Sequence, residues 1–401
     1  MISKKNLAKI IKKITKSYLF TLGIFSISTY TYAWEFNASG SSSATYKRTT
    51  FNSGTSGAND NDTNEYTSSA GGVTVSLTHS DGYANSAKFS YTADWNSDAG
   101  NFDEYVKVSG IKKVGGWTAS SSTTQHMQKD VTGAGDHAPM TSANSASFTL
   151  TNGSITYKLG DTAHLSTAEK TVNGPMEGTV DAEARVDSFD GFSIGFELGS
   201  GTLTVAIDEN DDQDMFGDRD LIVTCGSDNM GLGINFSGEV GIDLSLTYAI
   251  GSATANKTQC TGDNSSNTAS MSTIGLGIAV PFGGMQLAFD LESTAWDSKA
   301  RANETKESIN GLEISFIMPV GKATAGINLS QQENQTISGG LYTAKTSIAG
   351  TEAWYNVPIG PVGLSIGYGL SGTKVGCSTC SVSNEITSTS SQLGAEMTMS
   401  F

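Results

Sequence analysis

The sequence predicts an all-β protein, a transmembrane antiparallel β-barrel of 16 strands, with 18 strands as the alternative. Three observations predict this fold: an export signal at the N-terminus, strand-turn-strand segments that repeat at a fixed spacing, and an alternating segment that ends on Phe401. No run of about 18 apolar residues follows Ala33, so we expect no transmembrane helix after that residue.

The first 33 residues have the layout of a secretory signal peptide. Six lysines and no acidic residue precede an apolar run over 18–27, and small residues surround Ala33. That run is too short to span about 30 Å of hydrocarbon comfortably. We therefore expect removal of 1–33 after export and a barrel over 34–401.

Segment 392–401 alternates between apolar and polar residues. Its apolar face carries Leu393, Ala395, Met397, Met399 and Phe401. A tilted strand of about 9–11 residues crosses a membrane, and this pattern fits the last strand of an outer-membrane barrel. The same alternation could face a soluble core, so it leaves the surrounding solvent open when taken alone.

Three segments repeat the order strand, Pro/Gly turn, strand, and their prolines Pro281, Pro319 and Pro358 are 38 and 39 residues apart. That period fits two strands of about ten residues, a tight turn and a long loop. A propeller blade of similar length would hold four strands and show more turns. One face of each segment is apolar and the other polar, so the pattern predicts a lipid-facing and a lumen-facing side.

Extending the register gives sixteen strands, near 34–48, 72–79, 85–95, 144–151, 154–160, 190–198, 202–208, 230–237, 239–250, 272–280, 285–293, 311–318, 321–330, 348–357, 362–371 and 390–401. A hairpin within 102–119, turning at Gly115-Gly116, would make eighteen. Either number leaves an aqueous channel. We place the tight turns in the periplasm and long loops outside, near 209–229, 251–271, 294–310, 331–347 and 372–389.

The net charge of −16, from 24 basic and 40 acidic residues, excludes nucleic acid as a natural partner. Without the six signal-peptide lysines the balance is 18 against 40, or −22. With apolar residues outside, the register places lysines inward on the first, third and fifth strands and acids inward on most later ones. The predicted basic wall is Lys47, Lys88 and Lys158, and the predicted lumen acids are Glu197, Asp243, Asp290, Glu292, Glu313, Glu352 and Glu396.

The hairpin over 147–161 ends in Leu159-Gly160-Asp161, and about 29 residues then pass before a strand at Phe192. Here the chain resembles the general diffusion porins of Gram-negative bacteria, in which such a hairpin leads into a third external loop that folds into the barrel. The resemblance implies a homotrimer and a constriction loop over 161–189, although the aromatic-Gly-Gly tip common in that family is missing. It also implies acidic eyelet residues, namely Asp161, Glu169, Glu177, Asp181 and Glu183.

The four cysteines occupy polar stretches of an exported chain, which favours the disulfides Cys225–Cys260 and Cys377–Cys380 over a metal site. An acidic run with Asp208, Asp212 and Asp214 is a weak calcium candidate, because it lacks the calcium-loop glycine and glutamate. A solvated loop, bridged by divalent ions to lipopolysaccharide, is the simpler interpretation.

We expect no enzyme and no cofactor, since no spacing marks a catalytic set among the four histidines. The predicted function is passive diffusion of small hydrophilic solutes and ions through the outer membrane, with a preference for cations. A substrate-specific channel and a structural or adhesive barrel with a closed lumen remain as alternatives, and the inward charges could be no more than a solvated surface.

Overall fold

The computed structural model describes residues 34–53, 62–81, 85–96, 101–126, 144–176, 180–186, 191–208, 227–239, 241–255, 268–300, 303–338, 341–376 and 386–401. These residues form β-strands, tight turns and one long irregular segment. The predicted signal peptide lies outside them. No helix in these ranges is long and apolar enough to cross a membrane.

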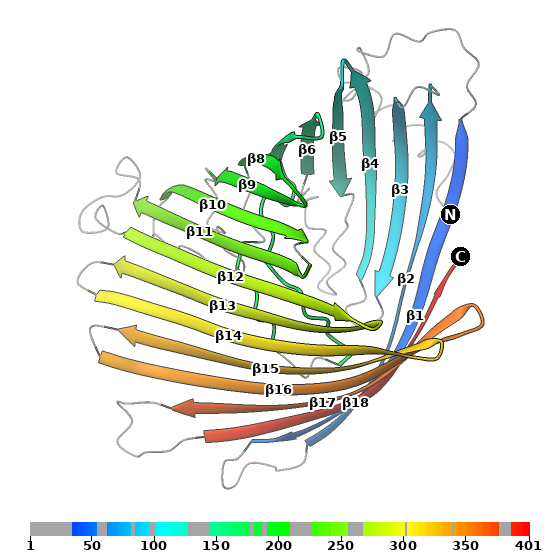
Figure 1. The fold of residues 1–401 in the computed structure, drawn as a ribbon. Helices are drawn as coiled ribbons and strands as arrows, with labels where there is room; N and C mark the ends of the chain where they lie inside the picture. Colours follow the sequence, from blue (N-terminus) through cyan, green and yellow to red (C-terminus); the bar gives the residue numbers. More distant parts are fainter. Residues whose placement is uncertain are drawn as a thin grey trace, which may run out of the picture.

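The strands are β1 (Glu35–Asn52), β2 (Asp62–Ser80), β3 (Ser86–Asn96), β4 (Asn101–Val114), β5 (Trp117–His126), β6 (Asn144–Thr151), β7 (Ile155–Gly160), β8 (Gly191–Leu198), β9 (Gly201–Asp208), β10 (Ser227–Glu239), β11 (Asp243–Ala255), β12 (Thr268–Phe282), β13 (Met285–Ala300), β14 (Asn303–Val320), β15 (Ala323–Ser338), β16 (Leu341–Ile359), β17 (Val362–Gly376) and β18 (Ile386–Ser400). Each strand pairs antiparallel with its neighbours in sequence, and β1 also pairs with β18. The sheet is therefore a closed barrel (Figure 1).

The barrel has 18 strands, so the preferred number of 16 is wrong and the alternative is confirmed. The two additional strands are β4 and β5, which turn at Gly115 and Gly116 with φ values of 59° and 83°. Positive φ at both central residues is typical of the tightest hairpin turns, and glycine adopts it without strain. Three lysines in β4 and the Ser/Thr-rich sequence of β5 weaken the apolar alternation on which the sequence prediction relied.

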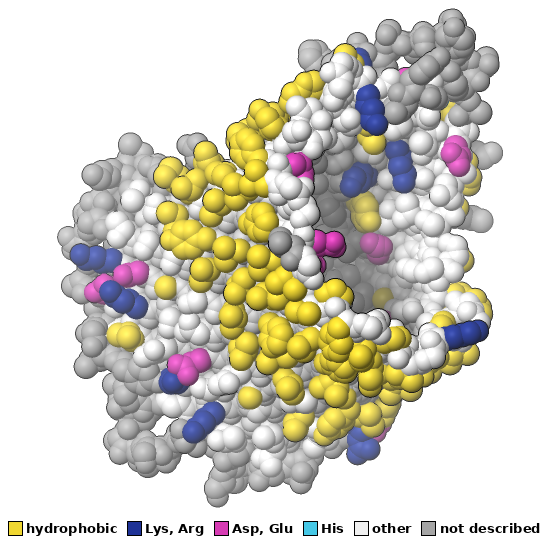
Figure 2. All heavy atoms as spheres, in the orientation of Figure 1, with side chains coloured by type: hydrophobic (Ala, Val, Ile, Leu, Met, Phe, Trp, Pro, Cys, Tyr) yellow, Lys and Arg dark blue, Asp and Glu magenta, His cyan; other side chains and the backbone are white. Residues whose placement is uncertain are grey.

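Large apolar side chains point outward at every second position in an apolar belt, and most inward neighbours are small or polar, with Met271, Trp296 and Trp354 as large inward exceptions. On β10 to β18, outward side chains exposed by 39% or more include Leu232, Ile234, Tyr248, Leu291, Leu312, Ile327, Tyr368, Leu393 and Met397. Figure 2 shows a broad band of apolar side chains, part of this belt, across the strands on the face turned to the viewer. The predicted apolar-out register is thus confirmed, and the belt is the surface that meets lipid.

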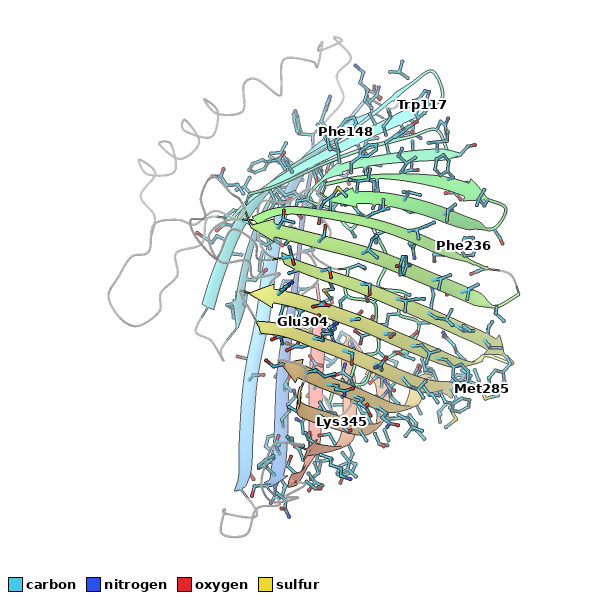
Figure 3. The ribbon with its side chains drawn as sticks, turned by 90° about the vertical axis from the view of Figure 1, so that its left-hand side faces the viewer. Trp117, Phe148, Phe236, Met285, Glu304 and Lys345 are labelled. Carbon is cyan, nitrogen blue, oxygen red and sulfur yellow. The ribbon has the colours of Figure 1, made fainter. Side chains whose placement is uncertain are left out.

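Most strands continue well beyond the belt. Residues 294–300, 303–310, 331–338 and 341–347 lie in β13 to β16, so the long loops predicted over 294–310 and 331–347 are wrong. These residues are rich in Ser, Thr, Asn and Gln on both faces, which suits strands that contact water on both faces of the sheet. Figure 3 shows Glu304 and Lys345 toward this end of the barrel and Met285 near the tight turns.

Strands β6 to β9 are much shorter, with 8, 6, 8 and 8 residues against 13 to 19 in β10 to β18. Their outward side chains are apolar. Tyr157 of β7 and Phe192 of β8 stack at 6.3 Å between ring centroids, and Trp117 of the neighbouring β5 stacks on Tyr157 at 6.4 Å. At a tilt near 40°, 6 to 8 residues rise only about 15–20 Å, less than the ~25 Å belt of a membrane barrel. We call β6 to β9 the short wall.

The ends of the chain close the barrel together. Gly40 and Phe401 exchange two backbone hydrogen bonds of 2.8 and 3.0 Å. The Phe401 ring lies over Gly40, where an added Cβ would come within 2.6 Å of it. The final strand therefore pairs with the first described strand, as the sequence predicts.

Candidate pore constriction

The segment between β7 and β8 folds into the barrel and runs along its inner wall. We call residues 161–186 the inner loop; its described parts are 161–176 and 180–186. It is the fourth connection on its rim of the barrel, because the β4–β5 hairpin precedes it, and not the third as the family resemblance implied. The inward fold itself is as predicted.

The start of the inner loop is fixed by Gly160 and His164. Gly160 has φ 86°, and an added Cβ would lie 2.1 Å from the Ala146 carbonyl oxygen, so only glycine fits there. His164 is buried, and its two ring nitrogens lie 2.9 Å from Ser193 Oγ and 2.7 Å from the Gly160 carbonyl oxygen. With both nitrogens engaged, His164 holds the turn and is not placed to take a metal ion.

From there the loop crosses the wall strand by strand. The Thr247 hydroxyl on β11 donates to the Ser166 carbonyl. On β13, Asp290 accepts from the Lys170 amide at 2.8 Å and from both the amide and hydroxyl of Thr171 at 2.7 and 2.5 Å. On β14, Ser315 accepts from the Val172 amide at 3.1 Å.

The far end of the loop reaches β15 to β18. Glu352 on β16 accepts from the amides of Gly174 and Met176 at 3.0 and 2.6 Å. The Met176 side chain, 1% exposed, packs over Gly367 of β17 and Gly394 of β18. The inner loop therefore spans about half of the barrel circumference before it turns back.

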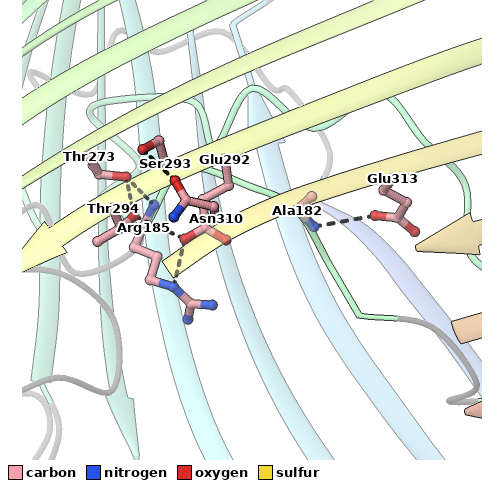
Figure 4. Close-up of polar contacts among 8 residues, drawn as sticks. All are labelled: Ala182, Arg185, Thr273, Glu292, Ser293, Thr294, Asn310 and Glu313. Atoms are coloured by element: carbon pink, nitrogen blue, oxygen red, sulfur yellow. Dashed lines mark hydrogen bonds and ion pairs between the residues drawn. The ribbon is translucent and has the colours of Figure 1, made fainter. Parts of the chain in front are cut away.

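The returning arm uses a second set of wall acceptors. Val180 donates its amide to Ser330, and Ala182 donates to Glu313 at 3.4 Å. Arg185 donates its amide to Thr273 at 3.3 Å, and its Nε lies 2.9 Å from Glu292 Oε1 (Figure 4). The two arms meet where the Ala184 amide donates to the Thr167 carbonyl at 2.8 Å.

Inward-facing glycines let the loop lie this close to the wall. A Cβ added at Gly277 would lie 1.7 Å from the Ala168 carbonyl oxygen, and one at Gly275 or Gly311 would lie 2.7 or 2.9 Å from the Cβ of Ala184 or Ala182. Glycine is the residue used where a backbone approaches closely. The high glycine content of the chain thus has a specific use inside the barrel.

These contacts correct the predicted role of four wall acids. Asp290, Glu292, Glu313 and Glu352 do point inward, but they are 0–4% exposed because the inner loop covers them. They hold the loop and are not open lumen charges. The alternation of the sequence predicts that these side chains point inward, but it contains no signal for the loop that covers them.

The other predicted acids have different surroundings. Asp243 forms an ion pair with the loop residue Lys170 at 2.9 Å. Glu197 accepts a hydrogen bond from Thr202, and Glu396 faces inward beside Thr45 of β1. On the loop itself, Asp161, Glu169 and Asp181 are exposed and Glu183 is half-buried, while Glu177 lies outside the described residues.

The opposite wall is basic. The register places Lys47, Lys88 and Lys158 inward, as predicted. It also places Lys107 and Lys113 of β4 inward, which the sequence analysis missed because β4 was not counted as a strand. Figure 2 shows the resulting hollow, with acidic side chains inside it and Lys or Arg side chains on the wall beside it.

Glu169 is the loop acid with the most perturbed environment. Burial in the narrowed lumen, and after it the negative charges of Glu183 and Asp181, raises the pKa of Glu169 to about 7. Its carboxyl group has access to solvent yet lies among other acids, so part of its charge is lost near neutral pH. The charge of the constriction therefore depends on pH in the physiological range.

The cysteines lie outside the described residues, as do Asp212 and Asp214 of the calcium candidate. Asp208 is described and is fully buried at the end of β9. Among the described residues no group of three or more His, Cys, Asp or Glu side chains is arranged to hold a metal ion.

Comparison with known proteins supports the fold. No family model matches the chain, and no curated protein matches it by sequence. The trimer form of OmpT, an outer membrane protein of Vibrio cholerae, is similar in structure with a TM-score of 0.50 and 8% identity, over 92% of this chain and 100% of that one. The chain folds as an outer-membrane β-barrel.

An anion-selective porin from Comamonas acidovorans is also similar, with a TM-score of 0.49 and 13% identity, over 92% of this chain and 100% of that one. The barrel described here has a closed antiparallel wall and an apolar outer belt. Its location is the outer membrane, since the belt requires lipid around the barrel.

Proposed function

We propose that the chain is an outer-membrane porin, through which small hydrophilic solutes and ions diffuse passively. A barrel of 18 strands, spaced about 4.8 Å apart and tilted near 40°, is about 35 Å across between its backbones. Side chains cannot fill such an interior, and the inner loop lies inside it. The observation that carries the proposal is this loop, which lies inside a wide lumen and narrows it beside the hollow seen in Figure 2.

We further propose that the pore prefers cations. The acids Glu169, Asp181 and Glu183 are on the inner loop, which is bonded to β11 to β16, whereas the inward lysines are on β1, β3, β4 and β7, so the solute would pass between opposite charges. Such a field orients dipolar solutes and penalises apolar ones. The acidic side lies on the narrowing element itself, which favours cations where the path is tightest.

Planar bilayer recordings of the purified protein test both proposals. We expect stepwise conductance and, in a salt gradient at pH 8, a reversal potential of cation-selective sign. Because Glu169 has a pKa of about 7, it is charged at pH 8 and neutral at pH 5.5, so cation preference should fall across this interval. In Glu169→Gln that fall should be clearly smaller, while the conductance steps persist.

Lack of stepwise conductance in the wild type would refute the porin proposal and favour the structural or adhesive barrel. Saturable block by a single solute would favour a substrate-specific channel. An anion-selective reversal potential at pH 8 would remove the charge proposal alone.

We also propose a homotrimer in which each copy covers the short wall of another. The OmpT structure is described as a trimer form, and the short wall supplies a surface of this chain for such contacts. Lipid would have to thin around strands that rise only about 15–20 Å, which costs free energy. Apolar contact with a second copy avoids that cost, while lipid and lipopolysaccharide surround the remaining belt.

Site-specific photo-crosslinking tests the proposed interface. A photoreactive residue at Phe196, on β8 of the short wall, should give covalent oligomers up to the trimer. The matched control is Leu291 on β13, which also points outward and has a similar exposure of 44% against 38% for Phe196. Equal crosslinking at both positions, or none at Phe196, would contradict the assignment.

A further inference from the structure

The described parts of the inner loop, 161–176 and 180–186, have no regular secondary structure, so their backbone amides need partners from outside the loop. Buried amides that lack an acceptor are costly, and nearly all find one. Over 170–176 the acceptors come from the barrel wall, and two carboxylates accept from four of the amides: Asp290 from Lys170 and Thr171, and Glu352 from Gly174 and Met176. Asp290 also accepts from the Thr171 hydroxyl. Both carboxylates are 0–1% exposed.

The segment between these two carboxylates is stretched. From Thr171 to Gly174 the loop advances one residue per wall strand, since Thr171 contacts β13, Val172 β14, Asn173 β15 and Gly174 β16. Wall strands are about 4.8 Å apart, whereas an extended chain advances about 3.3–3.6 Å per residue. The segment can match the wall only by running near full extension on a smaller radius inside the barrel.

Residues 171–174 stay at a constant distance from the wall only while both carboxylates remain bonded to the loop. Releasing either end gives residues 171–174 slack, and they can then move into the lumen or along the wall. Uncharged hydroxyl groups such as Ser315 hold the middle of the segment, and their hydrogen bonds are weaker than those to carboxylates.

We infer that Asp290 and Glu352 are positioning residues that set the width of the pore by clamping the inner loop at 170–171 and 174–176. This inference rests on the proposed porin function and deepens it. It assigns to two wall acids a role in pore size and steadiness, and leaves the ion preference to the acids that are exposed in the lumen.

The substitution Asp290→Asn replaces one acceptor oxygen with an NH2 group. This side-chain group is itself a donor, and it would face the backbone N–H donors of the loop. Glu352→Gln does the same at the other clamp. Each charge-assisted bond that is lost should raise the population of a displaced loop roughly tenfold or more. In single-channel recordings we expect current fluctuations within the open state to increase, and the distribution of step sizes to broaden, in both variants.

Three matched variants separate a clamp from a lumen charge. Thr171→Val removes one donor to Asp290 and keeps every charge, so it should increase the fluctuations and leave the reversal potential unchanged. Glu396→Gln removes an inward acid of β18 for which no hydrogen bond to the described part of the inner loop is observed, so it should alter the reversal potential without adding fluctuations. Asp290→Glu retains both acceptor oxygens and should disturb the current less than Asp290→Asn.

The recordings distinguish failure of this inference from failure of the proposed function. If the wild type shows no stepwise conductance, the porin proposal falls. If the wild type conducts and the Asp290→Asn, Glu352→Gln and Thr171→Val currents are as steady as its own, the clamp is refuted. A reversal-potential shift in Asp290→Asn as large as in Glu396→Gln, with steady current, would make Asp290 an ordinary lumen charge. Should Asp290→Asn fail to insert, Glu352→Gln and Thr171→Val decide.

Discussion

Excision of residues 168–183, with a Gly-Gly link from Thr167 to Ala184, is expected to raise the single-channel conductance roughly two- to threefold, because the bare lumen of an 18-stranded barrel is far wider than its constriction. The link is feasible because the Ala184 amide already donates to the Thr167 carbonyl at 2.8 Å, as in a hairpin that a two-residue turn can close. The measurement is the step size in planar bilayers at fixed salt.

The excision should also weaken cation preference, because the acids on the narrowing element are lost and the path past the remaining charges is wider, although the newly exposed wall acids should keep part of it. The excision removes Glu169 and its acidic neighbours on the loop, but it uncovers Asp290, Glu313 and Glu352, which are 0–1% exposed beneath the loop. Once exposed to water, these carboxylates are no longer destabilised by burial, and they line the lumen as charges. An unchanged conductance would mean that the inner loop does not limit flow and that another part of the path does.

The control for this excision is the wild-type barrel reconstituted from the same detergent, compared at equal protein to lipid ratio. Both proteins should show the same resistance to heat-induced unfolding of the sheet within a few degrees, because the strand pairings do not involve the excised residues. A large loss of sheet stability would show instead that the inner loop is a core on which the wall depends.

The strand register of β10 to β18 could be predicted from the sequence, because these strands carry large apolar residues at every second position in the belt. The β4–β5 hairpin was harder to detect, since its outward residues include Lys112 and Ser121 and its alternation is weak. The Gly115-Gly116 pair was the available signal. It was recognised as a turn, but the strands on either side of it were not counted.

The inward direction of the wall acids was also predictable, and their function was not. Period-two alternation tells which face a residue such as Glu352 occupies. It cannot tell that Gly174 and Met176, about 180 residues earlier in the chain, bring their amides to that carboxylate. Burial of a polar group depends on such distant contacts, which leave no local pattern.

The glycines of the inner face supplied a signal that sequence reasoning treated only as composition. Gly275 and Gly277 sit at inward positions of β12, where Ser, Thr or Asn would suit a wet lumen equally well. Glycine weakens a strand by roughly 0.5–1 kcal/mol relative to alanine, so repeated inward glycine indicates close approach by another backbone. That pattern alone predicts a covered wall.

Gly277→Ala is expected to destabilise the barrel by about 1–3 kcal/mol, the usual range for overpacking a filled interior. The added methyl group would lie 1.7 Å from the Ala168 carbonyl oxygen and 2.7 Å from Lys170 Cγ. The neighbour in closest contact is backbone, so the inner loop itself must shift. Denaturant unfolding in detergent or lipid vesicles measures the change.

The matched control is Gly372→Ala on β17, where the nearest atom to the added methyl, the Ser388 carbonyl oxygen, is 3.9 Å away. This variant should be neutral or more stable by about 0.5–1 kcal/mol, because alanine loses less conformational freedom than glycine on folding. Both sites are strand glycines, so a difference between them isolates the contact with the inner loop.

The same substitution in the excised protein completes a double-mutant cycle. Residues 168 and 170 are absent there, so the methyl group at position 277 meets open lumen and the cost of Gly277→Ala should vanish or change sign. An interaction free energy near the full 1–3 kcal/mol would show that glycine is needed on β12 because of the inner loop. If Gly277→Ala cost as much without the loop as with it, the glycine would serve the strand itself, and the close contact between loop and wall would have no energetic weight.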